Sequence, residues 1–331
     1  MSKRGCRPGW LVAALLSLVS GWAAASPPTV LATTGMIGDT VQAVGGECIN
    51  TEVLMGPGVD PHLYQASASD VQRFRDAALI AYNGFGLEGQ LDNVLARFGE
   101  RSPTLALAEA AAAQGPAGVI AGDEGYATDP HLWMDAALWA QGLTPLRDAL
   151  TAIAPDCAGL LAARADLHRS RLLALDAWLA ESIATIPAPQ RMMISAHDAF
   201  AYFGRAYDLE VRGIQGISTS AEAGVADIQR VAGVIAERGI PAIFVETTIN
   251  PRTVEAVLAA ARQRDAEVRI GGSLYGDALG EPGGLAEDLI GMLIANGITL
   301  VTALGGEVPP LPDALSPWQG RKRIFMEQLV E

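Results

Sequence analysis

A long stretch without helix breakers most constrains how this chain can fold. Residues 157–186 contain no proline and only one glycine, near the start of the stretch. Leucines and Trp178 recur along it at roughly helical spacing. Thirty helical residues would extend about 45 Å, which is long for a helix inside one globular domain. Pro187 and Pro189 end the stretch. It therefore predicts a spine helix that joins two lobes, and a stiff spine favours modest lobe motion.

The segments on either side of this helix alternate short apolar runs with helical stretches. The runs at 78–82 and 242–246 are continuously apolar until their last residues. Such runs between helices are typical of parallel strands covered on both faces. Further strands are predicted at 29–33, 51–55, 104–107, 191–195, 209–214 and 267–271. The predicted class is α/β, with two small doubly wound lobes. The predicted division is a signal peptide at 1–25, an N-terminal lobe at 26–154, a linking helix at 155–187 and a C-terminal lobe at 188–331.

The first residues have the pattern of an export signal. Lys3, Arg4 and Arg7 precede an apolar run at 11–19, and the small residues at 23–25 form a cleavage site. The apolar run is too short to span a bilayer as a helix, which disfavours the alternative of an uncleaved anchor. We expect a mature protein that begins at Ser26 and is soluble in a bacterial periplasm.

The charge of the mature chain bears on its partners, and its cysteines bear on a possible disulfide. Loss of the three basic residues of the signal would move the formal net charge from -14 to -17, which argues against nucleic acid as a partner. Such acidity suits cation handling, although many exported proteins are acidic. Cys48 and Cys157 remain after cleavage, and a disulfide between them stays open because nothing in the sequence brings them together.

Two of the four histidines lie in the same short motif. Asp60-Pro61-His62-Leu63 is echoed by a second Asp-Pro-His-Leu at residues 129–132. In each copy the proline fixes its own φ and biases the residue before it away from helix, so the histidine lies on a rigid turn. Rigid imidazoles are good ligands for borderline metals. The alternative is that the motif is turn chemistry alone, which two copies in a histidine-poor chain make less attractive.

Two further candidate ligands follow predicted strands in the second half. His197 lies two residues after the strand at 191–195, and Asp277 follows the strand at 267–271. Ligands in open α/β sheets bind beyond the carboxyl ends of the strands, so these side chains could converge with His62 if the lobes face each other. The place of His131 cannot be fixed by spacing. Taken singly, His197 could be a buried structural histidine and Asp277 a solvated loop residue.

The remaining polar residues of note have less specific interpretations. Glu246 could orient a ligand histidine through its second nitrogen, cap the next helix or pair with an arginine. His168, amid three arginines on the long helix, is expected to be a solvated surface residue. Trp318 and the basic run 321–323 are expected on the surface of the second lobe, because terminal segments are usually peripheral.

Together these motifs resemble those of the metal receptors of ATP-binding-cassette importers, the TroA/ZnuA-like (cluster A-I) family. The resemblance covers nearly the whole mature chain and is carried by residues 58–64, 82–84, 129–135, 197–200, 215–219 and 271–280. It implies two lobes joined by one long helix, and His62, His131, His197 and Asp277 as metal ligands. It also implies a receptor, not an enzyme, that delivers Zn²⁺ or Mn²⁺ as transported ligand to a membrane permease. We expect it to act as a monomer.

The metal is left open between zinc and manganese. Many zinc receptors of the family carry a His-rich loop before the second ligand, but residues 114–128 contain no histidine, and Asp123 and Glu124 are the nearby acids. Many manganese receptors have Glu at the third ligand, where this chain has His197. Three imidazoles favour zinc by ligand type.

Two other functions compete with the receptor. A periplasmic zinc hydrolase would keep one coordination position open for water, which four protein ligands would fill. No His-Glu-x-x-His or Gly-x-Ser-x-Gly motif is present in the sequence. An adhesin or structural exported protein could use the metal for stability alone.

Overall fold

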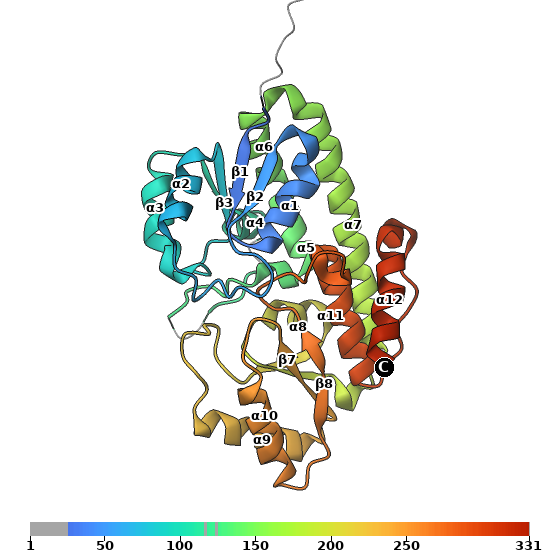
Figure 1. Cartoon of the computed structure of the whole chain (residues 1–331). Coiled ribbons are helices and arrows are strands. Elements are labelled where there is room, and N and C mark those ends of the chain that lie inside the picture. Colours follow the sequence, from blue (N-terminus) through green and yellow to red (C-terminus); the bar gives the residue numbers. More distant parts are fainter. Residues whose placement is uncertain (1–25, 116–117, 123–124, 331) are drawn as a thin grey trace, which may run out of the picture.

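The protein consists of two α/β lobes joined by the long helix α7, Ala158–Ala184, which runs along both (Figure 1). The structure is a computed structural model that describes residues 26–115, 118–122 and 125–330. The predicted signal peptide, Asp123 and Glu124 lie outside the described residues. The predicted class, two lobes and a spine helix are confirmed. In the described part of the chain, no helix combines the length and hydrophobicity needed to cross a membrane.

The N-terminal lobe is built on one parallel sheet. Its strands are β1 (Thr29–Ala32), β2 (Asn50–Val53), β3 (Leu79–Tyr82) and β4 (Thr104–Ala106), in the order β2-β1-β3-β4. Its helices are α1 (Gly35–Gly45), α2 (Ala68–Asp76), α3 (Asp92–Gly99), α4 (Leu107–Gln114), α5 (Ala136–Trp139) and α6 (Leu143–Ile153). Because the sheet is parallel, the carboxyl ends of its strands share the edge that faces the second lobe (Figure 1).

The C-terminal lobe has two short parallel ladders. Its strands are β5 (Met192–Ser195) paired with β6 (Glu210–Gly213), and β7 (Ala242–Glu246) paired with β8 (Arg269–Leu274). Its helices are α8 (Ala201–Tyr207), α9 (Val225–Arg238), α10 (Arg252–Arg262), α11 (Leu289–Ala303) and α12 (Gln319–Val330). β5 and β7 lie close together, so the two ladders form one layer.

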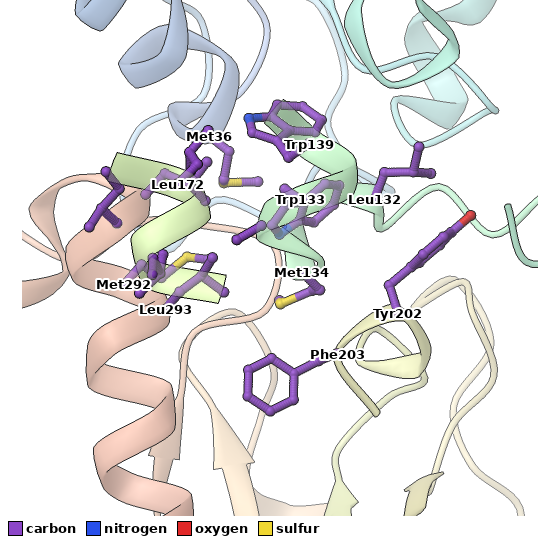
Figure 2. Packing of buried hydrophobic residues seen from close by; sticks show 14 of the residues in the cluster. Met36, Leu132, Trp133, Met134, Trp139, Leu172, Tyr202, Phe203, Met292 and Leu293 are labelled. Atoms are coloured by element: carbon purple, nitrogen blue, oxygen red, sulfur yellow. The ribbon is translucent and has the colours of Figure 1, made fainter. Parts of the chain in front are cut away.

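One apolar core is continuous from lobe to lobe beside the spine. Figure 2 shows Trp133 and Trp139 of the first lobe, Leu172 of α7, and Phe203 and Met292 of the second lobe in this core. All five side chains are almost completely buried. Smaller clusters lie under α2 and α3 and between the second sheet and α9 and α10. The lobes are therefore fused by apolar packing on the spine side.

Local sequence signals explain several helix ends. Ser67 caps α2 in a capping box with Asp70. A short 3-10 turn at 140–142 separates α5 from α6. Pro145 therefore lies in the first turn of α6, where a backbone N–H has no partner within the helix. α11 was not predicted because all of its residues except Thr302 are buried, which leaves no amphipathic period to detect.

The prediction that His168 is a solvated surface residue is wrong. The residue is 5% exposed and lies on the same face of α7 as buried Leu161, Ala165, Leu172 and Leu175. The neighbouring arginines point elsewhere: Arg169, for example, donates to the carbonyl of Ala140. Burial, with Arg171 nearby, lowers the pKa of His168 to about 4, so the imidazole is neutral.

The predicted exposure of the C-terminal segment is also wrong for two residues. Trp318 is 7% exposed and Lys322 is 6% exposed. The Lys322 ammonium donates to the carbonyl of Pro309 and lies over the ring of Trp178, so its stem packs against the spine. Arg323 does remain exposed. The segment is buried because it packs against the apolar face of α7, to which Trp178 belongs.

The open question of the cysteines is answered by a disulfide. Cys48, after α1, is bonded to Cys157, just before α7, across a sequence separation of 109 residues. The bond fastens the first lobe to the start of the spine, as expected for a compartment in which disulfides persist.

Candidate metal centre

The four predicted ligands come from loops that follow strands and meet between the lobes. His62 follows β2 through the turn at Asp60-Pro61, His197 lies two residues after β5, and Asp277 lies three residues after β8. His131 reaches the same place from the loop between α4 and α5. Sheet topology thus explains three of the positions, and the fourth is set by packing of its loop.

Each Asp-Pro-His motif forms the turn that its sequence predicts. An oxygen of Asp60 accepts from the backbone N–H of His62 at 2.9 Å, and an oxygen of Asp129 accepts from that of His131 at 2.9 Å. These are Asx turns, in which the carboxylate reaches the backbone two residues on. Turn chemistry and ligand presentation therefore coexist, since the turn aims the imidazole.

The ring nitrogens converge on one carboxylate. The Nε2 atoms of His62 and His197 lie 3.3 and 3.2 Å from Oδ2 of Asp277, and that of His131 lies 3.4 Å from Oδ1. One ligand atom from each of the four residues fits within 4.8 Å of all the others. Among the described residues, this is the only group of three or more His, Cys, Asp or Glu that could hold a metal ion.

The chemistry of this cluster fits a metal ion. His62 is 4% exposed, Asp277 1%, and His131 and His197 are fully buried. The three Nε2 atoms and both oxygens of Asp277 are buried without a hydrogen bond in the described structure. Buried polar groups are normally satisfied, so five such atoms facing one point indicate a missing partner that accepts lone pairs, which is a cation.

In the metal-free protein the cluster is held by charge. Burial lowers the pKa of His131, but Asp129 and Asp277 outweigh it and raise the pKa to about 9. Against the same effect of burial, Glu246 and Asp277 raise the pKa of His197 well above its usual value. Burial opposes ionisation of Asp277, yet the histidines hold its pKa well below the usual range. These shifts favour protonated imidazoles at His131 and His197 beside an ionised Asp277.

The second nitrogen of each imidazole has its own partner. Nδ1 of His131 lies 2.7 Å from an oxygen of Asp129, and Nδ1 of His197 lies 2.8 Å from Oε2 of Glu246. Nδ1 of His62 instead lies 3.2 Å from the hydroxyl of Tyr126. Such partners leave Nε2 of each imidazole facing the centre of the cluster. Tyr126 was not predicted, because nothing in a loop sequence marks a tyrosine as the partner of a residue 64 positions away.

Close packing around His197 requires a small residue at Gly276. A Cβ added there would lie 2.6 Å from Oε2 of Glu246 and 3.3 Å from Cε1 of His197. The carbonyl of Gly276 also accepts from the indole N–H of Trp133, which ties the Asp277 loop to the opposite lobe. Gly276 thus lets the second-lobe ligands approach the first lobe closely.

The protein has two α/β lobes with parallel sheets, joined by a spine helix. A buried cluster of imidazoles and one carboxylate lies between them. This combination defines a two-lobed solute-binding protein whose site is of the metal-binding kind. Residues 30–303 match the family described as "Zinc-uptake complex component A periplasmic". The chain belongs to this family of metal-binding transport receptors.

Individual relatives span nearly the same length. The chain is 37% identical to manganese-binding lipoprotein MntA of Bacillus subtilis over 83% of this chain and 89% of that protein. It is 38% identical to zinc-binding protein TroA of Treponema pallidum over 85% of this chain and 90% of that protein. The solved structure of the latter periplasmic protein superimposes with a TM-score of 0.80, at 37% identity over 84% of this chain and 99% of that one.

Proposed function

We propose that this protein is an exported receptor that captures one divalent transition-metal ion between its lobes and delivers it to the permease of an ATP-binding-cassette importer. The observation that supports this most directly is the set of five buried, unsatisfied ligand atoms that face one another. Relatives named for manganese and for zinc binding support the same class of cargo.

His62, His131, His197 and Asp277 are the proposed ligands. Three Nε2 atoms would bind the ion, and Asp277 would neutralise part of its charge with one or both oxygens. Asp129 and Glu246 would hold the second nitrogens of His131 and His197, which makes those imidazoles stronger ligands. Glu246 is thus proposed as an outer partner of His197.

Zinc is the proposed cargo by ligand type, with manganese as the close alternative. Three imidazoles and one carboxylate suit a four-coordinate zinc ion. Manganese prefers more oxygen ligands and higher coordination, which both oxygens of Asp277 would partly supply. Both of those oxygens face histidine nitrogens, so the geometry accommodates either ion.

Calorimetric titration of the metal-stripped mature protein with zinc, and separately with manganese, tests the proposal. We expect tight binding at one equivalent that is lost in His62→Ala. His168→Gln is the matched control, because it removes a histidine from α7 and leaves the cluster intact. Binding that survives in His62→Ala, or that is lost equally in His168→Gln, would overturn the ligand assignment.

The same reasoning disfavours an enzyme. A zinc hydrolase keeps a coordination position open beside a substrate, whereas all four proposed ligands are almost completely buried. Asp277→Ala should abolish tight metal binding in a receptor. In a hydrolase it would spare binding and impair turnover.

Export, partner and assembly complete the proposal. The basic and apolar start of the chain would direct it to the periplasm and be removed before Ser26. The permease would accept the metal from a monomer. Metal uptake that survives deletion of the protein would favour an adhesin or structural role.

A further inference from the structure

In both Asp-Pro-His turns the aspartate accepts from the backbone N–H of the histidine. The second contact of the aspartate differs between the two turns. In the His131 turn, one oxygen of Asp129 accepts from the backbone N–H and also pairs with the ring of His131 itself. In the His62 turn, Oδ1 of Asp60 accepts from the backbone N–H, and Oδ2 accepts from the hydroxyl of Thr219 at 2.6 Å. Thr219 belongs to the opposite lobe, 159 residues away.

A second contact joins the same two regions. The hydroxyl of Tyr126 lies against Nδ1 of His62, and the nearby side chain of Ser218 opposes the rise that burial causes in the pKa of this hydroxyl. Neighbouring residues of one C-terminal loop therefore lie close to both the carboxylate beside His62 and the hydroxyl against its ring. No contact of this loop with the His131 turn is present among the described hydrogen bonds.

The loop that makes these contacts is weakly held by its own lobe. In the described structure, residues 217–223 make no backbone–backbone hydrogen bond. The nearest residues that do are 214–216 before the segment and 224 after it. Only Ile217 anchors the segment by burial, and the residues at 220–222 are exposed. Segments with few backbone bonds and little burial open at low cost.

The position of the contacts favours a releasable function. Other polar contacts between the lobes, such as Trp133 with Gly276 and Tyr202 with the carbonyl of Asp129, are buried. Asp60 and Thr219 are only half-buried. The loop between β6 and α9, to which Thr219 belongs, lies on the side of the molecule away from α7 (Figure 1). This side can open while the spine side stays packed.

We propose that Thr219 and Asp60 form a latch between the lobes that holds the His62 turn in the metal site and sets the rate at which the ion leaves. Both are positioning residues, because they act through His62 and the proposal rests on its role as a ligand. Changes to contacts between parts that close on a ligand alter dissociation more than association, so loss of the latch should appear chiefly in the dissociation rate. It acts on the lobes and not on the ligand atoms, so zinc and manganese are retained by similar factors.

The test is the dissociation rate of zinc and of manganese from Thr219→Val, measured by chelator competition in a stopped-flow instrument. A hydrogen bond to a charged group, reduced by partial exposure, makes a roughly tenfold faster loss of both ions the expected result. Association rates should stay within about twofold. Thr247→Val, an exposed threonine of the same lobe, is the matched control and should dissociate like the wild type.

A double-variant cycle ties the effect to the carboxylate. Asp60→Ala should release metal faster, and adding Thr219→Val to it should change little, since the partner is already absent. Asp60→Asn keeps one acceptor for the backbone N–H of His62 and can direct its NH2 group to the Thr219 hydroxyl, which then accepts, so it should restore retention in part. If the increases in dissociation rate from the two substitutions multiply in the double variant, the latch is overturned. An unchanged dissociation rate in Thr219→Val would overturn it as well.

The two proposals fail in distinguishable ways. If wild type binds and His62→Ala does not, but Thr219→Val matches the wild type, the latch is wrong and the receptor stands. If His62→Ala binds as well as wild type, the ligand set is wrong, whatever Thr219→Val does. If Thr219→Val changes the zinc-to-manganese ratio, the residue shapes ligand geometry and the latch is again overturned.

Discussion

Glu246 contacts both the ring and the backbone of His197. Oε2 lies 2.8 Å from Nδ1, and Oε1 accepts from the backbone N–H of His197 at 2.9 Å. Both residues are almost completely buried, so no water competes for these contacts. The carboxylate therefore fixes the ring plane and keeps the proton on Nδ1, which leaves Nε2 free to bind a cation.

Replacement of Glu246 by glutamine should weaken metal binding by about 10–100-fold. An amide N–H directed at Nδ1 would favour the tautomer that carries its proton on Nε2, the atom aimed at the metal. Calorimetry with zinc measures the change, and exposed Glu237→Gln on α9 is the control. An affinity equal to that of wild type would mean that Glu246 serves packing alone.

Metal binding should displace protons, because the metal-free site holds them. Asp129 and Asp277 raise the pKa of His131 to about 9 against the effect of burial, and the pKa of His197 is raised well above its usual value. Both imidazoles are thus protonated at pH 7 and must lose a proton to bind the ion.

We therefore expect release of about two protons per zinc ion at pH 7, and an affinity that rises with pH between 6 and 9. Calorimetry in buffers of different ionisation enthalpy counts the protons. The His131→Ala variant should release about one fewer proton where binding is still measurable. A binding enthalpy independent of buffer would show that the imidazoles are already neutral.

The Cys48–Cys157 disulfide should stabilise the first lobe without affecting the metal site. It closes a loop with a sequence separation of 109 residues, for which the loss of chain entropy in the unfolded state corresponds to about 5 kcal/mol. The double variant Cys48→Ser and Cys157→Ser should melt roughly 5–10 °C lower by calorimetry. Zinc affinity should remain within about twofold, since neither cysteine touches a proposed ligand.

An unchanged melting temperature would mean that packing of α1 against the spine is sufficient. Reduction of the wild type with a thiol is the matched experiment, and it should reproduce the double variant. If reduction has no effect while the variant is destabilised, the serines themselves disturb packing at Cys48, which is only 6% exposed.

The features that depend on local chemistry or on strand direction could be predicted from the sequence. Asp-Pro-His predicts its own turn, and the rule that ligands gather beyond the ends of parallel strands brings His197 and Asp277 toward His62. The long helix follows from the absence of breakers between Cys157 and Pro187. In each case a few neighbouring residues decide the result.

Features that depend on tertiary packing could not be predicted in this way. His168 was misplaced because charged neighbours suggested solvent, whereas its helical phase with Leu161 and Leu172 determines its burial. α11 has no polar face to reveal it. The contacts of Tyr126 and Thr219 join loops that are far apart in the chain, so only the arrangement of the lobes creates them.

Glu88 should make stability fall as the pH rises through neutrality. It is fully buried under the first-lobe loops and accepts from the hydroxyl of Thr33 and the backbone N–H of Asn83. Burial outweighs these hydrogen bonds and raises its pKa from 4.5 to about 7. The folded state therefore binds a proton more tightly than the unfolded state, and this contribution is full below about pH 4.5 and lost as the pH passes 7.

Glu88→Gln should consequently melt at a higher temperature than wild type at pH 8 and show no gain at pH 5. The neutral amide keeps an acceptor for Asn83 and avoids the cost of a buried charge. Thermal melts of both metal-free proteins between pH 5 and pH 8 measure the difference in melting temperature. The histidines titrate in both proteins, so their effect cancels in this difference. The exposed Glu100→Gln is the control and should follow the wild type throughout. A variant less stable than wild type at pH 8 would show that the charged hydrogen bonds to Thr33 and Asn83 stabilise the loops by more than desolvation costs.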